Sequence, residues 1–382
     1  MKTRRLGLLG AVALVVSSLI VGIPATAQAA TEPAVSVVAS GLNNPRGLTF
    51  GPDHQLYVAE GGTGGPQSTT AGQCAQVPMV GPYTGGFTAS ISRINVVTGG
   101  RQTVINGLPS SQTQASPVAP PLVSGVADVA FVKDRLYALI AGAGCSHGLL
   151  GTVNSILRVG TNGSSSQVAD LSAFVKAHGV ANPDAADFEP DGTWYSMIRA
   201  GHSFYAVEPN HQELDRITSR GHISRVVDFS RMFPGNTDWR GPTAIARHGE
   251  SLYIGTLTPF PIVVGAAQVF KVDPESGEPS VFAGGFTTVL GLAFDRHGSL
   301  YVLETSTKAG FPVPGFGQIV KISGNHRTTV ATGFNMPTAM TFGPDGNLYV
   351  SNNGFGHKPG EGEIKKVAVH TDGEDRADSG DE

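Results

Sequence analysis

Short apolar runs separated by turn residues recur along the whole chain. The most regular run is Leu-Tyr-Val or a close relative of it. It occurs six times, at residues 56–58, 136–138, 204–206, 252–254, 300–302 and 348–350. A shorter apolar run precedes each copy, and Gly, Pro, Asn and Asp fill the gaps, which is the composition of tight turns. The pattern predicts short β-strands joined by turns.

A third strand follows each copy, and a fourth strand follows five of the six. The third strand ends in Arg or Lys plus an apolar residue, at 93–94, 158–159, 216–217, 271–272, 321–322 and 366–367. The fourth strand is recognisable five times, at 102–108, 166–171, 223–229, 279–286 and 328–334. Repetition of such a unit predicts an all-β fold, a six-bladed β-propeller of four-stranded antiparallel blades.

The sixth copy has no fourth strand of its own. Residues 35–45 (VSVVASGLNNP) resemble residues 328–337 (TTVATGFNMP), which contain the fourth strand of the fifth copy. We therefore expect the N-terminal strand to complete the last blade and close the ring, which removes open sheet edges. Two ordinary domains are the alternative, but they would leave the last sheet one strand short.

The first 29 residues have the pattern of a secretory signal peptide. Lys2, Arg4 and Arg5 precede an apolar run, and small residues follow, so we expect cleavage after Ala29 or Ala30. An uncleaved membrane anchor is the alternative, because the apolar run is just long enough to span a bilayer. The sequence thus predicts a secreted protein, extracellular or in the cell envelope.

The mature chain divides into a propeller and a tail. Residues 370–382 are acidic and lack large apolar side chains, so we expect them to be disordered, with the propeller occupying 30–369. Losing the three cationic residues of the signal changes the formal net charge from −4 to −7. This mild charge argues against nucleic acid or an anionic membrane as a partner. No later apolar stretch is long enough to cross a bilayer, and we expect a monomer.

Two longer phrases carry a family resemblance. Residues 41–65 read GLNNPRGLTFGPDHQLYVAEGGTGG, and residues 281–305 read VFAGGFTTVLGLAFDRHGSLYVLET. The repeat resembles NHL-type and gluconolactonase-like propellers in general, and these phrases resemble the ScyD/ScyE family. The resemblance implies a propeller fold over nearly the whole mature chain, but it implies no catalytic residues.

The predicted connections differ between the two faces of the ring. We label the strands of a blade a to d, outward from the axis. Because neighbouring strands are antiparallel, the short a–b and c–d links share one face, and the b–c and blade-to-blade d–a links share the other. The b–c links are the long ones, at 61–89, 141–154, 257–266, 305–316 and 353–361. This long-loop face is the predicted binding surface. Alternatively, the loops only cap the ring.

The two cysteines belong to adjacent loops of that face. Cys74 lies in the b–c link of the first blade and Cys145 in that of the second. In an exported protein this placement predicts a disulfide. Two free thiols or a pair of metal ligands are the alternatives.

The last residue of each b strand is the sharpest candidate for chemistry. In blade order these residues are Glu60, Ile140, Glu208, Thr256, Glu304 and Asn352. Three carboxylates and one amide oxygen form an all-oxygen set of the kind that calcium or magnesium prefers. We therefore predict a divalent-cation and ligand site at Glu60, Glu208, Glu304 and Asn352. In the alternative, each side chain bonds to neighbouring backbone.

Three histidines are predicted on the same face. His211 and His357 join the predicted ligand site, and His147 is a further candidate for catalysis or a transition metal. The chain contains no G-x-S-x-G elbow, Walker loop, H-E-x-x-H or dinucleotide fingerprint.

Two hypotheses of function follow. The first is a non-enzymatic binding protein that recognises a small molecule, glycan or protein through the long-loop face. The second is a metal-dependent hydrolase, lactonase or lyase of the gluconolactonase-like propeller type.

Overall fold

The computed structural model describes residues 34–65, 69–78, 80–113, 121–183, 185, 188–232 and 240–369. The predicted signal peptide (1–29) and acidic tail (370–382) lie outside these residues. In the part that is described, no helix is long and apolar enough to cross a membrane.

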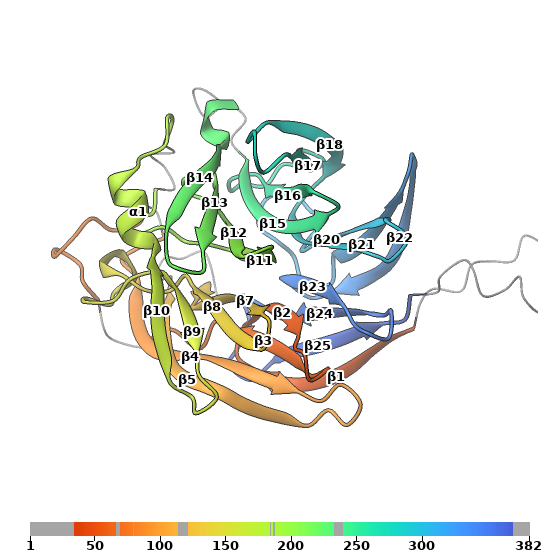
Figure 1. Ribbon diagram of the computed structural model, residues 1–382, viewed down its shortest axis with the longest axis horizontal. Helices are drawn as coiled ribbons and strands as arrows, with labels where there is room; N and C mark the ends of the chain where they lie inside the picture. Colours follow the sequence, from red (N-terminus) through yellow and green to blue (C-terminus); the bar gives the residue numbers. More distant parts are fainter. Residues whose placement is uncertain are drawn as a thin grey trace, which may run out of the picture. The chain divides into compact units, whose positions relative to one another are not determined.

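Six antiparallel sheets surround a common axis, so the structure is the six-bladed propeller that the sequence predicts (Figure 1). The a strands are β2 (Pro45–Phe50), β7 (Val126–Val132), β11 (Ser196–Ala200), β15 (Gly241–His248), β19 (Val289–Phe294) and β23 (Ala339–Phe342). The b strands are β3 (Leu56–Glu60), β8 (Arg135–Ile140), β12 (Ser203–Glu208), β16 (Ser251–Leu257), β20 (Leu300–Glu304) and β24 (Leu348–Asn352).

The outer strands complete each blade. The c strands are β4 (Thr84–Ile94), β9 (Ser155–Val159), β13 (Glu213–Thr218), β17 (Ala267–Val272), β21 (Gly317–Ser323) and β25 (Gly362–Val367). The d strands are β5 (Arg101–Gln112), β10 (Ser165–Asp170), β14 (Ile223–Asp228), β18 (Pro279–Phe286), β22 (His326–Phe334) and β1 (Val35–Leu42). The first blade has a fifth strand, because the two-residue β6 (Val123–Ser124) pairs with the end of β5.

The N-terminal strand closes the ring. β1 pairs antiparallel with β25, from Val35 opposite Val367 to Leu42 opposite Gly362, and Figure 1 shows the two side by side. The a strands contact one another in sequence around the axis, and β23 of the last blade touches β2 of the first. The predicted completion of the last blade is therefore confirmed.

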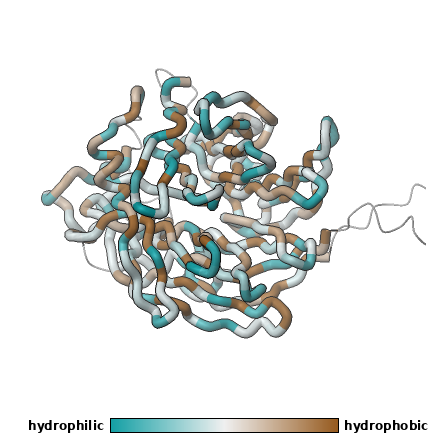
Figure 2. The backbone as a smooth tube through the Cα atoms, viewed as in Figure 1, coloured by the Kyte–Doolittle hydropathy of each residue, from teal (hydrophilic) through white to brown (hydrophobic). Residues whose placement is uncertain are grey.

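Aromatic pairs between blades explain why the Leu-Tyr-Val phrase recurs. The tyrosine of one blade packs edge-to-face against the phenylalanine at or next to the end of the a strand of the next blade. The ring centroids are 4.7 to 5.1 Å apart for Tyr57–Phe131, Tyr253–Phe294, Tyr301–Phe342 and Tyr349–Phe50. Such pairs add to apolar burial. Figure 2 shows the resulting hydrophobic segments spread through all the blades.

The third blade departs from this pattern. In the third and fourth blades an arginine replaces the phenylalanine near the end of the a strand, and Tyr137 packs instead against Phe204 of the b strand. Trp194 and Tyr195 lie just before β11. The segment before them contains α1 (Leu171–Ala177), whose first turn is capped by the Asp170 carboxylate, which accepts from the Ala173 N–H.

The disulfide prediction is confirmed. Cys74 and Cys145 are bonded, with Cα atoms 6.3 Å apart. Cys145 opens the short 3-10 helix η1 (Cys145–His147), and a second one, η2 (Phe229–Met232), follows β14. The bridge closes a loop of 71 residues, which in the chain-entropy description stabilises the fold by about 4 kcal/mol. It joins the loops of the first two blades.

Candidate functional site

Glu60, at the end of the first b strand, is fully buried and bonded within its own blade. Its carboxylate accepts hydrogen bonds from the Asn43 backbone N–H at 2.7 Å and the Ser92 hydroxyl at 2.5 Å. The Arg101 guanidinium lies 3.0 and 3.2 Å from its two oxygens. The side chain therefore fastens strands b, c and d to the segment that leads into β2.

Glu304 repeats this arrangement in the fifth blade. One oxygen accepts from the Thr287 backbone N–H at 2.5 Å, and the other accepts from the Gln318 amide at 2.6 Å. Thr287 and Asn43 occupy the same place in the repeat, four residues before the glycine of their a strands. A carboxylate at this position thus satisfies a backbone N–H that the sheet ladder does not reach.

The third and sixth blades use the position in the same way. Glu208 accepts from the Thr193 backbone N–H at 2.6 Å and also from the His211 backbone N–H. The Asn352 side-chain oxygen accepts from the Asn335 backbone N–H at 2.8 Å. We call Glu60, Glu208, Glu304 and Asn352 the clasp residues.

The remaining two blades differ. Thr256 bonds to both backbone groups of Gln268 on the neighbouring strand, and Ile140 is apolar and buried. Each clasp residue contacts groups of its own blade. Among the described residues, no three His, Cys, Asp or Glu side chains come close enough together to hold a metal ion. The shared cation site stays a prediction, and the contacts give each clasp residue a structural role.

The three predicted histidines lie in separate settings. His211 Nδ1 is 3.2 Å from a Glu208 carboxylate oxygen, and His357 Nδ1 is 3.4 Å from Glu361 in the same loop. Burial is the largest influence and would lower the pKa of His211, but the charge and hydrogen bond of Glu208, together with the charges of Glu213 and Glu189, raise the pKa overall.

His147 belongs to a buried network that joins three blades. Its Nδ1 is 2.9 Å from the Ser111 hydroxyl, and its Nε2 is 3.1 Å from a Glu189 carboxylate oxygen. Tyr83 donates to the other Glu189 oxygen at 3.0 Å. Burial opposes the charged imidazole, yet the hydrogen bond and charge of Glu189 raise the pKa of His147. Asp191 nearby accepts from the Ser146 N–H and hydroxyl, each at 2.7 Å.

A second buried acidic pair lies in the third blade. Glu213 and Asp215 are fully buried on β13, and burial raises the pKa of both carboxyl groups. Glu213 is paired with Arg225, and Asp215 accepts from the Trp194 indole N–H at 3.3 Å. The charge of Glu213 further favours the neutral form of Asp215. The pair therefore keeps a proton at pH values above the range in which carboxyl groups usually lose it.

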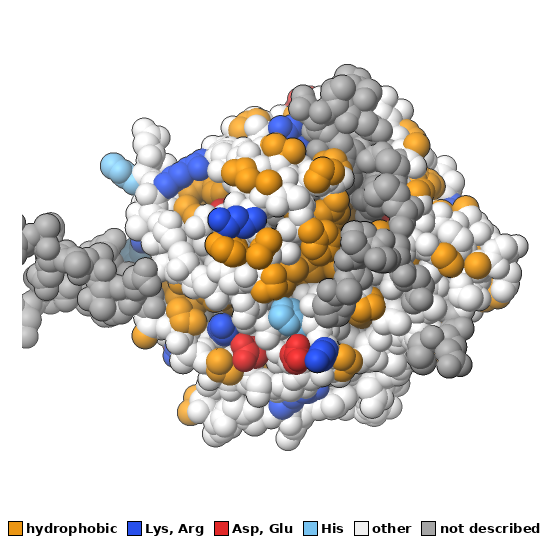
Figure 3. Space-filling model, turned by 180° about the vertical axis from the view of Figure 1, so that it is seen from behind, with side chains coloured by type: hydrophobic (Ala, Val, Ile, Leu, Met, Phe, Trp, Pro, Cys, Tyr) orange, Lys and Arg blue, Asp and Glu red, His pale blue; other side chains and the backbone are white. Residues whose placement is uncertain are grey.

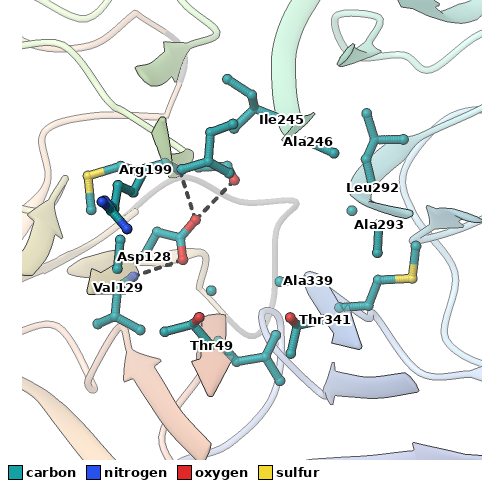
Figure 4. A pocket seen from close by; sticks show the side chains of 18 of the residues that line it. Thr49, Asp128, Val129, Arg199, Ile245, Ala246, Leu292, Ala293, Ala339 and Thr341 are labelled. Carbon is teal, nitrogen blue, oxygen red and sulfur yellow. Dashed lines mark hydrogen bonds between the residues drawn. The ribbon is translucent and has the colours of Figure 1, made fainter. Parts of the chain in front are cut away.

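A cavity of about 510 Å³ lies on the axis, between the a strands (Figure 4). Its lining comes from all six blades and includes residues at the ends of the a strands beside the short a–b turns, among them Arg199 and Arg247. The cavity thus opens on the face opposite the long loops. Sequence reasoning predicted no site on that side.

An apolar cluster closes the axis toward the long-loop face. Leu290, Met336 and Phe355 are buried together, with Leu122 and Tyr195 packed against them. These residues come from different blades and from the links that lead into them, so they meet only where the blades converge. We call this cluster the plug. The Arg46 guanidinium lies over the Tyr195 ring, 5.5 Å from its centroid, and covers that side of the plug.

Asp128 is the acidic residue in the lining of the cavity. Its carboxylate accepts from the Val129 N–H at 2.8 Å, the Met197 N–H at 2.8 Å and the Ser196 hydroxyl at 3.0 Å (Figure 4). Burial raises the pKa of Asp128 to about 7, although these hydrogen bonds oppose the shift. A carboxyl group that titrates near neutrality inside a cavity is typical of functional sites.

The repeat contains a signal for Asp128 that sequence reasoning missed. The pairing register between strands a and b aligns Asp128 with one residue in each of the five other blades. These residues are Gly47, Ser196, Ala244, Gly291 and Ala339. The position is small everywhere else because it faces the axis. A Cβ on Gly47 would lie 1.9 Å from the Asp128 carboxylate, so the acid occupies space that glycine leaves.

The long-loop face carries an exposed apolar surface on the fourth and fifth blades. Its members are 37 to 57% exposed, and we call them the apolar loop surface: Phe260, Val263, Val264, Phe311, Val313 and Phe316. Figure 3 shows hydrophobic side chains gathered around basic ones on one face of the molecule.

The two loops that form this surface are held together. Ile262 and Gly310 exchange backbone hydrogen bonds of 2.8 and 2.9 Å, and the Phe260 and Phe311 rings stack with centroids 5.0 Å apart. The Lys308 ammonium lies 4.3 Å from the Phe316 ring centroid. The exposed side chains therefore stand on a rigid base.

No protein-family model matches the chain, and no curated protein matches it in sequence. Solved structures share the fold. A putative oxidoreductase (glucose dehydrogenase) of Thermus thermophilus has a TM-score of 0.54 at 17% identity, covering 88% of this chain and 99% of that one. The PQQ-bound aldose sugar dehydrogenase of Streptomyces coelicolor gives 0.53 at 15%, covering 89% and 100%. The calcium-binding protein regucalcin of Agrobacterium tumefaciens gives 0.51 at 12%, covering 88% and 96%. The chain is thus similar in fold to these propellers.

Proposed function

We propose that the chain is an exported, non-enzymatic binding protein that recognises a protein partner through the apolar loop surface. The observation that carries this proposal is the exposure of six large apolar side chains on two linked loops. Contiguous apolar patches are uncommon on monomers and are typical of interaction sites. The mixture of valine and phenylalanine favours a protein over a glycan, because a sugar ring mainly uses aromatic faces.

Export rests on two supports. The predicted signal peptide is one, and the Cys74–Cys145 disulfide fits an oxidising compartment. The contacts between the two loops also support binding, since a surface ordered in advance loses little conformational entropy in a complex. Membership of the ScyD/ScyE family stays part of the proposal and depends on residues 41–65 and 281–305.

Site-specific crosslinking in the exporting cells tests the proposal. A photoreactive benzophenone amino acid at Val263 should give one discrete adduct with another protein. The matched control is Val97, which is 90% exposed in a c–d turn on the opposite face and should give none. The Val263 adduct should disappear in the Phe260→Ser/Phe311→Ser variant.

Equal adducts from both positions, or an adduct that survives the double substitution, would refute the proposal. An adduct with a second copy of the chain would replace a foreign partner with self-association and would contradict the expected monomer.

A metal-dependent hydrolase, lactonase or lyase is the second candidate. The Ser111–His147–Glu189 contacts favour it, because a hydroxyl, an imidazole and a carboxylate in line can activate a nucleophile. Ser111 is fully buried, however, so the first proposal is preferred. Calcium or magnesium could bind the clasp residues in this candidate only by replacing the hydrogen bonds that each of them makes within its own blade. Chelator should then lower the melting temperature, and added calcium should raise it.

A further inference from the structure

The axial cavity is closed at one end and open at the other. The plug around Leu290, Met336 and Phe355 closes it toward the long loops, whereas the opposite end lies among the a–b turns. Its volume of about 510 Å³ falls in the range of small-molecule sites. It lies at the far end of the ring from the apolar loop surface, so the two sites are independent.

The carboxylate of Asp128 retains capacity for a further partner. A carboxylate has about four acceptor sites, and the protein fills three of them, one on Oδ1 and two on Oδ2. The remaining site is on Oδ1. Each of the five other blades has Gly, Ala or Ser at this position, so the fold itself does not require an acid there.

The basic residues of the lining do not neutralise Asp128. Arg199 donates to the carbonyl of Gly201 in its own turn at 2.9 Å, and Arg247 pairs with Glu250 at 3.1 Å. Both arginines are exposed at the rim. Among the described residues, Asp128 is therefore a buried acid without a cationic partner in its cavity, although a buried charge ordinarily needs one.

The rest of the lining divides into a polar and an apolar part. Thr49 and Thr341 belong to adjacent blades and lie on the same side of the cavity in Figure 4. The wall formed by the second, third, fourth and fifth blades is aliphatic: Ala130, Ile198, Ala246, Leu292 and Ala293. A ligand that fits has a cationic end, a compact hydrocarbon body and room for a hydroxyl group.

We propose that the axial cavity binds a small molecule with a protonated primary amine, which forms an ion pair with Asp128. The ammonium donates to the unfilled site on Oδ1. The hydrocarbon body packs against the aliphatic wall, and the hydroxyls of Thr49 and Thr341 meet a polar substituent of the ligand.

Binding is expected to tighten as pH rises through about 7, where Asp128 loses its proton. The other titratable group beside it is Tyr195, whose pKa burial raises, so it stays neutral over this range. The cationic groups of the lining are the guanidinium groups of Arg199 and Arg247, and Arg46 lies over the Tyr195 ring.

The test uses a matched pair of compounds, trans-4-aminocyclohexanol and 1,4-cyclohexanediol, which differ by an amine in place of a hydroxyl. Titration calorimetry with the full mature protein at pH 8 should show binding of the amine and at least about ten-fold weaker binding of the diol. The affinity for the amine should fall about ten-fold or more at pH 5.

Two variants separate charge from shape. Asp128→Ala reproduces the residue of the fourth and sixth blades and should lose about ten-fold in affinity for the amine at pH 8, while its affinity for the diol is unchanged. Thr49→Leu keeps the charge but fills the cavity and should weaken both compounds. Absence of amine binding to the wild type would overturn the proposal, as would equal binding of the amine and the diol or an Asp128→Ala variant that binds the amine normally.

Discussion

Glu304 and Asp128 are both buried carboxylates on strands of the same ring, but only Glu304 belongs to the repeat. Glu304 has counterparts in the other clasp residues, and each accepts a backbone N–H from the segment leading into its own blade. Asp128 stands where the other blades have a small residue, and it faces a cavity. The comparison shows that a polar side chain found at the same position in several blades stabilises the fold. One that departs from the register needs another explanation.

Closure of the ring supports all six blades, so its loss should reduce the stability of the protein more than any other change. A chain that begins at residue 43 lacks β1, which exposes the edge of β25 and removes the buried side chains of Ala39 and Leu42. We expect loss of cooperative thermal unfolding, measured by circular dichroism. A chain that begins at residue 34 is the control and should melt as the mature protein does. Equal melting of the two chains would contradict closure by β1.

The clasp residues should come next. Glu60→Ala leaves Arg101, Ser92 and the Asn43 N–H without their acceptor, and we expect a loss of about 3 kcal/mol in unfolding free energy. Glu60→Gln keeps one acceptor and should lose about 1 to 2 kcal/mol. Both values come from urea unfolding.

The control for this series is Glu250→Gln. That carboxylate also pairs with an arginine, Arg247, but its side chain is 96% exposed, so the change should cost less than about 0.5 kcal/mol. Similar losses of unfolding free energy for Glu60→Gln and Glu250→Gln would mean that the clasp residue does not stabilise the fold.

The buried pair Glu213 and Asp215 should have a smaller effect that depends on pH. Burial raises the pKa of both groups, so the stability they contribute is present at low pH and is lost as pH rises through their folded pKa values. Asp215→Asn stays neutral and can donate to Glu213. We expect it to match the wild type near pH 5 and to exceed it near pH 9. A wild type that loses no stability relative to this variant between those values would show that the pair holds no proton.

The fold could be predicted from the sequence because its information is local and repeated. The sequence pattern predicted each Leu-Tyr-Val strand, its turns and the lack of a sixth d strand at the end of the chain. β1 lies where the likeness of 35–45 to 328–337 predicted it. The Cys74–Cys145 bridge followed from the order of the loops.

The candidate sites could be predicted only in part, because side-chain direction is not a property of the repeat. The ends of the b strands were located correctly except in the fourth blade, where β16 runs one residue past Thr256. Sequence could not tell whether Glu60 and Glu304 point toward a common cation or into their own blades. The network of His147 and Glu189 joins loops of three blades, which no local pattern reveals. Asp128 was detectable, since it breaks a column of small residues, but that column becomes clear only once the pairing register is known.

Unfolding free energies of Glu304→Gln and Asp128→Ala, measured side by side at pH 8 with calcium or with chelator, test the contrast between recurring and departing acids most directly. Glu304→Gln should lose about 1 to 2 kcal/mol whether or not calcium is present, because it removes an acceptor from the fold. Asp128→Ala should be no less stable than the wild type at pH 8. Burial raises the pKa of Asp128 to about 7, so the wild type loses stability as pH rises from about 4 to about 7, and the variant does not. A loss for Asp128→Ala as large as that for Glu304→Gln would contradict the contrast, and so would calcium-dependent stabilisation of the wild type that Glu304→Gln abolishes.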